Sequence, residues 1–346
     1  MTDFDKIYAD VFKGDPTLKV EAEANREIIE KIIELREKKN VLILGHNYMH
    51  PLIYNLSDHK GDSLALSKWA SESDKPIILF DGVLFMAETA KVLSPQKKVL
   101  IADKKAGCSL ADPIRGKDVL SLKKLFPGVP VVTYVNSYAE VKAESDICCT
   151  SANALKVILS LNTDKVIFLP DSLMGENLQN ELKEMGHNIE VIYPGKNNDL
   201  QRGICEVHKQ FNVKDLRAIR EQYDMPKGHP KRAVLAHWEC TPEVIAESDF
   251  VGSTSQMAKY VKDNKPEKVF LATECEMAAN LANEFPQTEF VRVCNVFCKH
   301  MRRITLKAML HALETEDPEE HEVTLPEEII QKAQKPIQRM LEIPRN

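Results

Sequence analysis

Hydrophobic residues follow two different spacings along the chain, and the change between them divides the sequence. In residues 19–40 the apolar side chains recur with the spacing of one helix face, at positions 20, 28, 29, 32, 33 and 35. From residue 41 onward, short runs rich in Val, Ile and Leu alternate with longer stretches of helical spacing. This alternation is typical of parallel α/β units. The pattern therefore predicts a helical lead-in followed by an α/β fold.

The predicted strands fall into three groups, in residues 41–112, 130–208 and 232–301. In chain order they are VLILGH, PIILFDG and KVLIAD, then PVVTYVN, DICCTS, KVIFLPD and IEVIYPG, then RAVLAHWE, DFVGSTS, KVFLATE and EFVRVCN. We predict a helical lead-in over residues 1–40 and three α/β domains over 41–115, 116–210 and 211–300. Residues 301–346 are expected to form a helical segment that packs back on the first domain.

A cysteine stands shortly after the last strand of each group, at Cys108, Cys205 and Cys298. The intervals are 205 − 108 = 97 and 298 − 205 = 93 residues. A near-constant interval indicates three similar domains, each with a cysteine at an equivalent place. No residue-level identity relates the groups, so the spacing alone also allows three unrelated cysteines.

Composition narrows the class of protein. The chain has 346 residues, of which 43% are hydrophobic and 28% charged, as in soluble globular proteins. Its net charge of −6 argues against a surface for nucleic acid or anionic membrane. No apolar run approaches the roughly 18 residues of a membrane span, and the N-terminus lacks the apolar core of a signal peptide. We expect a cytoplasmic protein with reduced thiols.

Eight cysteines are more than an ordinary cytoplasmic core needs; they are at positions 108, 148, 149, 205, 240, 275, 294 and 298. In a reducing compartment they are buried apolar side chains, catalytic thiols or metal ligands. No CxxC…CxxC spacing occurs, which argues against a zinc module local in sequence. Open α/β sheets bind ligands beyond the carboxyl ends of their strands. Three such domains around one axis would bring the three strand-end cysteines to one interface, where they could present thiolates to one metal centre.

Other polar side chains are concentrated at the same strand ends: His46, Asn47, Tyr48, Ser63, Tyr134, Asn136, Thr150, Ser151, His208, His237, Glu239, Ser253 and Thr254. Each alone has an ordinary explanation, such as a loop hydrogen bond or a helix N-cap. Together they predict acid–base groups around one substrate. Ser and Thr at helix starts favour a small ligand with carboxylate or phosphate groups. Neither GxGxxG nor GxxxxGK[ST] occurs, so a nucleotide-phosphate loop is not supported.

Taken together, several motifs resemble those of the quinolinate synthases: GHNYM, GDSLALS, FMAETAKVLSP, AGCSLADP, YVNSYAEVKAESDICCTSANA, CEVHKQF, DFVGSTSQM and MRRITL. They run in the family's order from about residue 41 to 310. The resemblance implies three pseudo-symmetric three-layer αβα domains with short parallel sheets around a central active site. It implies one 4Fe–4S cluster per chain, held by three cysteines with one iron left open as a Lewis acid. The implied reaction condenses iminoaspartate with dihydroxyacetone phosphate to quinolinate, phosphate and water, in de novo NAD biosynthesis.

The resemblance also assigns roles to residues. The acid–base candidates are His46, Tyr48, Tyr134 and Glu239. The substrate-binding candidates are Ser63, Asn136, Ser151, His208, His237, Ser253 and Thr254. The cluster ligands are Cys108, Cys205 and Cys298. The implied partners are the two small substrates and functional coupling to an L-aspartate oxidase, with neither nucleic acid nor membrane.

The stretch CNVFCKHMRR contains two cysteines four residues apart. The family's third ligand lies three residues before a Met that leads into ITL, which here makes it Cys298, before Met301. Cys294 matches an extra upstream cysteine of some members, displaced by one inserted residue. The resemblance therefore assigns iron to Cys298; the alternative that Cys294 is a ligand, or forms a redox disulfide with Cys298, stays open. The remaining cysteines are expected to be packing residues: Cys148, Cys149, Cys240 and Cys275.

Three positions depart from the family's common pattern: Leu52 replaces a Glu, Leu84 a His and Trp238 a Pro. These changes either lie outside the site or mark a relative with another substrate. The alternatives are therefore an iron–sulfur hydro-lyase for another small di-acid, a cluster-based sensor, and a zinc hydrolase built on HWEC and CEVH. Metal analysis distinguishes the zinc hydrolase from the iron–sulfur proteins. Product analysis distinguishes the quinolinate synthase from the hydro-lyase.

Overall fold

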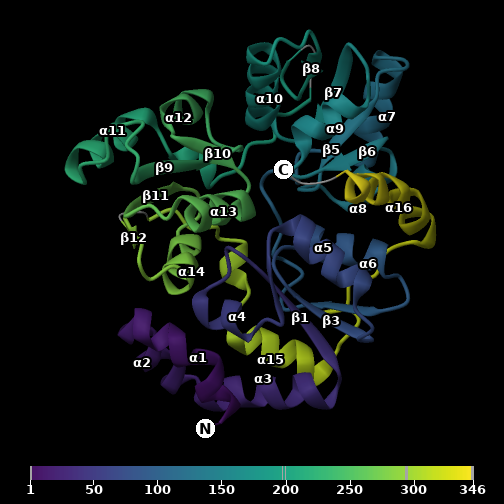
Figure 1. The fold of residues 1–346 in the computed structure, drawn as a ribbon. Coiled ribbons are helices and arrows are strands. Elements are labelled where there is room, and N and C mark those ends of the chain that lie inside the picture. Colours follow the sequence, from purple (N-terminus) through teal and green to yellow (C-terminus); the bar gives the residue numbers. More distant parts are fainter. Residues whose placement is uncertain (1, 197, 199, 293–294, 344–346) are drawn as a thin grey trace.

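The structure is a computed structural model, and it describes residues 2–196, 198, 200–292 and 295–343. In this part of the chain the strands form three four-stranded parallel sheets with helices on their faces (Figure 1). The strand orders are β2-β1-β3-β4, β6-β5-β7-β8 and β10-β9-β11-β12, so the same order recurs three times. The predicted fold of three α/β units is confirmed. The exact domain boundaries stay predictions.

Each sheet and its helices form one unit. The first unit consists of β1 (Val41–His46), α4 (Pro51–Leu56), β2 (His59–Gly61), α5 (Ser63–Glu72), β3 (Ile77–Asp81), α6 (Leu84–Leu93) and β4 (Lys98–Ile101). The second consists of α7 (Gly116–Leu125), β5 (Val131–Tyr134), α8 (Ala139–Ala143), β6 (Ile147–Cys149), α9 (Ala154–Ser160), β7 (Lys165–Leu169), α10 (Ser172–Glu184), β8 (Glu190–Ile192) and the 3₁₀ turn η1 (His208–Gln210). The third consists of α11 (Val213–Gln222), β9 (Arg232–His237), α12 (Pro242–Glu247), β10 (Phe250–Gly252), α13 (Thr254–Asn264), β11 (Lys268–Ala272), α14 (Glu276–Glu284) and β12 (Glu289–Phe290).

The third unit shows why its strand sequences are apolar without alternation. Consecutive side chains of a strand point to opposite faces of a sheet. Leu235 therefore joins a core cluster with Met257 and Leu281 of α13 and α14, while Val234 joins another with Leu216 of α11. Both faces are covered by helices, so both sets of side chains are buried, as expected of parallel sheets.

Helices at both ends of the chain frame the first unit. They are α1 (Asp3–Gly14), α2 (Pro16–Ala24), α3 (Arg26–Lys38), the 3₁₀ turn η2 (Met301–Arg303), α15 (Leu306–Thr315) and α16 (Glu327–Glu342). α15 packs on α3, and α16 lies against both α6 of the first unit and α8 and β6 of the second (Figure 1). In the part of the chain that is described, no helix is long and apolar enough to cross a membrane.

Two local predictions differ from the structure. The lead-in over residues 19–40 is not one helix: α2 ends at Ala24, α3 begins at Arg26, and Val20 is 72% exposed instead of lying on the buried face. Strand β2 was not predicted, because its sequence HKG contains no apolar run. It is an edge strand that pairs with β1 through backbone groups, and of its three residues only Gly61 is buried.

Candidate active site

One inner strand of each sheet brings an equivalent pair of residues to the same cavity. β1, β5 and β9 end at His46, Tyr134 and His237, and two residues further on come Tyr48, Asn136 and Glu239. All six side chains line a cavity of about 680 Å³, its mouth included. The carboxyl ends of three separate sheets therefore meet at one site, as the sequence predicted from strand ends.

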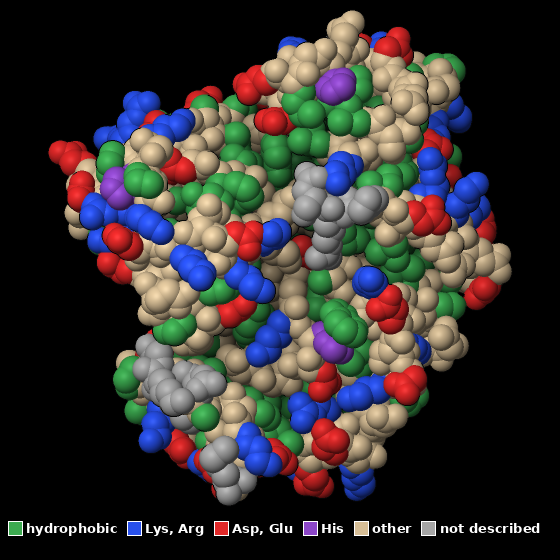
Figure 2. Space-filling model, viewed as in Figure 1, with side chains coloured by type: hydrophobic (Ala, Val, Ile, Leu, Met, Phe, Trp, Pro, Cys, Tyr) green, Lys and Arg blue, Asp and Glu red, His purple; other side chains and the backbone are tan. Residues whose placement is uncertain are grey.

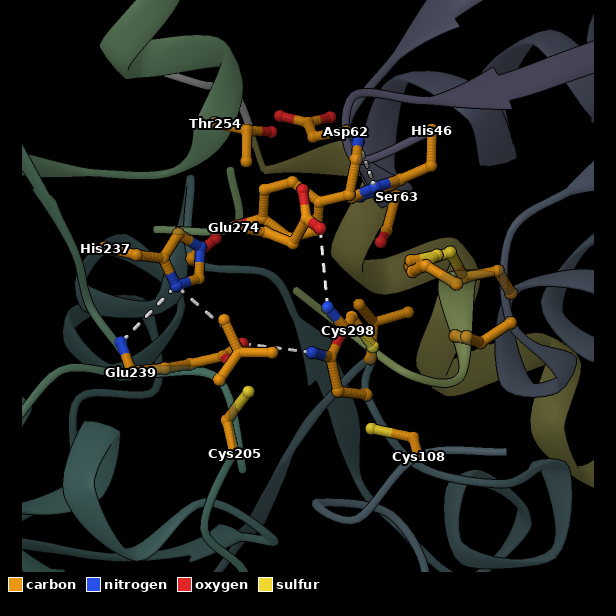
Figure 3. Close-up of a pocket in the computed structure, with 18 of the residues that line it drawn as sticks. His46, Asp62, Ser63, Cys108, Cys205, His237, Glu239, Thr254, Glu274 and Cys298 are labelled. Atoms are coloured by element: carbon orange, nitrogen blue, oxygen red, sulfur yellow. Dashed lines mark hydrogen bonds and ion pairs between the residues drawn. The ribbon is translucent and has the colours of Figure 1, made fainter. Parts of the chain in front are cut away.

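The three predicted ligand cysteines line the same cavity. Cys108 follows β4, Cys205 precedes η1 and Cys298 precedes η2, and all three are free thiols of intermediate exposure. In Figure 3 they lie on one side of the cavity, opposite Thr254 and Asp62. The lining around them includes the apolar side chains Val83, Phe85, Met86, Val207 and Met301.

These thiols fit a metal-bound role. Burial raises the pKa of Cys108 and Cys205 above the ordinary range and that of Cys298 to about 11, because an apolar surrounding disfavours the thiolate. Among the described residues that line the cavity, none is Lys or Arg. A bound metal centre would supply the positive charge that three thiolates in these largely apolar surroundings require.

Glu239 is the centre of the polar network in the cavity. Its Oε1 accepts hydrogen bonds from the Tyr134 hydroxyl at 2.7 Å and the Asn136 amide at 3.0 Å. Its Oε2 lies 2.9 Å from Nδ1 of His208. Burial by itself would raise the pKa of this carboxyl, but the neighbouring His208 and the hydrogen bonds from His208 and Tyr134 outweigh burial and hold the pKa below its usual range. The side chain is therefore a carboxylate at neutral pH.

Two cavity histidines are neutral, with the ring proton on a defined nitrogen. Burial lowers the pKa of His46 to about 4 and of His237 to about 3. Nδ1 of each ring accepts a backbone N–H two residues on, from Tyr48 at 3.2 Å and from Glu239 at 3.4 Å. The proton of each neutral ring consequently sits on Nε2, which makes both rings hydrogen-bond donors for an oxygen of a ligand.

A second group of contacts joins the first unit to the third. The Tyr48 hydroxyl lies 2.5 Å from the hydroxyl oxygen of Thr273, which is 2.9 Å from Nε2 of His208. Burial raises the pKa of Tyr48 and of Tyr134 well above the ordinary value, and the charge of Glu239 adds to it. Both phenols therefore keep their protons at neutral pH.

Two helices begin at the cavity. Ser63 is the first residue of α5 and Thr254 the first of α13, and both line the cavity together with Ser151. Helix N-termini carry free N–H groups and partial positive charge, which attract carboxylates and phosphates. Ser253 is not among the lining residues; its hydroxyl caps α13 by accepting the N–H of Gln256 at 3.2 Å.

Part of the site could also hold a single metal ion. Ligand atoms of Cys205, His208 and Glu239 all lie within 4.8 Å of one another. This set contains Cys205, one of the three predicted cluster ligands, and resembles the mixed ligands of zinc sites. A metal centre held by the three cysteines and a single ion held by Cys205, His208 and Glu239 would both need Cys205. Elemental analysis of the purified protein distinguishes between these two possibilities.

Comparison with known proteins identifies the family. The family described as "Quinolinate synthetase A protein" matches residues 30–342. Quinolinate synthase 2 of Mesorhizobium japonicum is 46% identical over 316 residues, which cover 91% of each chain. The quinolinate synthases of Agrobacterium fabrum and Caulobacter vibrioides are each 47% identical, over 91% and 92% of this chain and 85% and 82% of their own.

The chain belongs to the quinolinate synthase family. It is an enzyme of this type, and the resemblance of its motifs to those of the family is confirmed. The positions that depart from the family's common pattern, Leu52, Leu84 and Trp238, are not among the described residues that line the cavity. The Trp238 ring packs against the second unit's core, and its carbonyl accepts a hydrogen bond from Asn177 at 2.8 Å. That contact ties the backbone between His237 and Glu239 to α10.

The remaining cysteines divide into two groups. Cys148, Cys149 and Cys240 are buried free thiols within core clusters, as predicted. Cys275 is disulfide-bonded, so the prediction that it only packs, with its thiol reduced, is wrong. The prediction about Cys294 concerns a residue outside the described ones.

Three further polar residues at the site are not among those predicted from the sequence: Asp62, Thr273 and Glu274. Thr273 and Glu274 directly follow β11, the strand formed by the run KVFLA, so their position just past a strand end is the sequence signal that points to them. Burial raises the pKa of Glu274 to about 8, and nearby Glu276 adds to this effect. Asp62 lines the cavity and is the N-cap of α5.

We expect the cluster-free protein to lose stability as the pH falls from about 6.5 toward 4. The folded-state pKa values of His46 and His237 lie below their ordinary value of 6.5, so in this range the unfolded chain binds more protons than the folded one. Each histidine then contributes a slope of about 1.4 kcal/mol per pH unit. Urea unfolding at a series of pH values measures it. His46→Gln is expected to flatten the slope, whereas Gln at the exposed His187 leaves it unchanged; an equal slope in His46→Gln would contradict the assignment.

Proposed function

We propose that the chain synthesises quinolinate from iminoaspartate and dihydroxyacetone phosphate, with release of phosphate and water, in de novo NAD biosynthesis. The observation that carries the proposal is the convergence of three thiols and the strand-end polar residues on one cavity, in a chain of this family. An L-aspartate oxidase is the enzyme that we propose supplies the iminoaspartate.

We propose that Cys108, Cys205 and Cys298 hold one 4Fe–4S cluster. Cys108 follows β4 of the first unit, Cys205 lies before η1 in the second, and Cys298 lies between β12 of the third unit and η2. Their apolar surroundings, without a lining Lys or Arg, favour a cationic centre between them. Three cysteine ligands leave one iron open, and such an iron supplies Lewis-acid chemistry when the cluster is bound.

The polar side of the cavity suits small anions. Ser63 and Thr254 place the N-termini of α5 and α13 there, and the neutral His46 and His237 offer Nε2–H donors. Ser151 and Asn136 add further donors from the second unit. Figure 2 shows a hollow in the middle of one face, with Lys and Arg side chains as well as Asp and Glu side chains around its edge.

Protons would be moved by the phenols and by Glu239. Tyr48 and Tyr134 are protonated at neutral pH and can donate, while the Glu239 carboxylate can accept. The hydrogen bond from Tyr134 to Glu239 joins a donor and an acceptor in one pair, so that a proton taken up by Glu239 can pass to Tyr134 after that phenol has donated its own. His208 orients Glu239 from the other side.

Product analysis under anaerobic conditions tests the proposed reaction. Protein reconstituted with iron and sulfide is given both substrates, and quinolinate and phosphate are measured by liquid chromatography with mass spectrometry. We expect quinolinate and phosphate in equal amounts. A cluster without quinolinate would favour the hydro-lyase or the sensor, and zinc without acid-labile sulfide would favour the hydrolase.

A further inference from the structure

A second group of metal-binding side chains lies outside the active-site cavity, on the segment that leads to the last helix. It consists of His311 on α15 and of Glu320 and His321 in the loop that follows that helix. One ligand atom from each of the three lies within 4.8 Å of the other two. We call this group the His–Glu–His cluster.

The geometry of the cluster is compact. Nδ1 of His311 lies 2.7 Å from Nε2 of His321. One carboxylate oxygen of Glu320 lies 4.0 Å from the first of these nitrogens and 3.8 Å from the second. A tetrahedral ion bound at about 2.05 Å from each nitrogen would hold them roughly 3.3 Å apart. The His311 side chain is half-exposed on the surface of its helix, so its ring can move the few tenths of an ångström that this requires.

His321 is oriented as a metal ligand before any ion binds. The residue is buried, and its Nδ1 lies 3.2 Å from the carbonyl oxygen of Ile101. Since a carbonyl only accepts, Nδ1 carries the proton and donates it, which leaves the lone pair of Nε2 facing His311 and Glu320. A backbone carbonyl behind a ligating histidine is the usual support for such a ligand, because it fixes both the tautomer and the ring.

The loop that carries two of the ligands is also preformed. The carboxylate of Asp317 accepts the N–H groups of Glu319 and Glu320, at 2.7 and 3.0 Å. The N–H of His321 donates to the carbonyl of Asp317 at 2.8 Å. Ordering the loop therefore adds little to the cost of binding an ion.

We propose that His311, Glu320 and His321 bind one first-row divalent cation of the zinc type, with water at the remaining position. Two imidazoles and one carboxylate suit zinc and its neighbours, whereas magnesium and calcium prefer oxygen ligands alone. When the ion binds, the His311 ring releases the Nδ1 proton that lies between the two rings and takes up a proton at its exposed Nε2. The ring stays neutral, so no further reactant is needed.

The position of the cluster indicates what the ion would do. Directly after His321 the chain runs beside β4, where Leu100 bridges Glu322 and the N–H of Val323 donates to Val99 at 2.8 Å. It then continues into α16, which packs on α8 of the second unit. An ion would fasten α15 to the start of this connection between two units, and it would stabilise the folded chain without touching the active site.

Zinc titration of the protein that carries its iron–sulfur cluster, prepared without a histidine tag, tests the proposal. Competition with a zinc-binding dye counts the bound ions, and iron analysis shows that the cysteine site stays occupied. We expect His311→Ala and Glu320→Gln to bind about one zinc ion per chain fewer than the wild type, or to bind it roughly tenfold or more weakly. Zinc should also raise the Tm of the wild type and not that of His311→Ala.

Two comparisons make the result decisive. His187 is exposed and lies outside the cluster, so His187→Ala should keep the full zinc equivalent and the shift in Tm. Equal zinc binding and equal Tm shifts in wild type and His311→Ala would overturn the proposal. Because the experiment measures zinc binding and not quinolinate formation, its result tests the zinc site independently of the proposed reaction.

Discussion

Replacement of Glu239 by Gln is expected to lower kcat by at least roughly 100-fold, the usual minimum contribution of a placed acid–base group. The carboxylate accepts hydrogen bonds from Tyr134 and Asn136 and faces Nδ1 of His208. An amide of the same shape cannot accept from all three, because one of its two polar atoms is a donor. It also cannot take up a proton. Steady-state assays of quinolinate formation on anaerobically reconstituted protein measure the effect.

Cluster content and a surface variant separate this effect from misfolding. Iron, sulfide and the visible spectrum of Glu239→Gln should match those of the wild type, since the side chain is not one of the proposed ligands. Glu243→Gln, at an exposed position in α12 a few residues away, should keep wild-type kcat. Near-normal turnover by Glu239→Gln with an intact cluster would show that the network of Glu239 does not serve the reaction.

The second large effect is expected from Cys298→Ala, which should abolish both the cluster and the activity. Wild-type protein prepared without oxygen should contain about four iron and four sulfide per chain. With Cys298 removed, only Cys108 and Cys205 remain of the three proposed ligands, and two thiolates do not hold a cubane cluster firmly. Iron and sulfide analysis with the visible spectrum measures the loss.

Two matched cysteine variants give this experiment its controls. Cys240 is a buried free thiol whose Sγ lies 3.3 Å from the carbonyl of Ala272, so Cys240→Ala should keep the cluster. Cys294→Ala should keep it as well, if the ligand is the residue three positions before Met301. Loss of the cluster in Cys294→Ala together with its retention in Cys298→Ala would reverse the assignment.

Several features of this protein were predictable from the sequence because they depend on local pattern. Apolar runs such as KVFLA are buried on both faces of a sheet, so they mark strands wherever they occur. Parallel strands share one carboxyl edge, so the residues just past them, such as His46 and Glu239, could be grouped before their positions in space were known. The motifs that identify the family lie at these same ends.

Other features were decided by tertiary structure alone. β2 has no apolar run and is a strand only because β1 offers its edge. The position of Thr273 just after β11 does not reveal that its hydroxyl lies between Tyr48 and His208. The protonation states of Glu239 and His237 depend on burial and on neighbours from other units, and neither can be read along the chain.

The sequence by itself determined the strands with apolar runs, the threefold recurrence of α/β units and the residue types available for chemistry. It did so because backbone periodicity and strand burial are properties of neighbouring residues. Only the tertiary structure decided that three thiols face one cavity and that His311 meets His321. These contacts join side chains from different elements. The distance between such side chains is set by the packing of whole helices and sheets, and no short stretch of sequence encodes that packing.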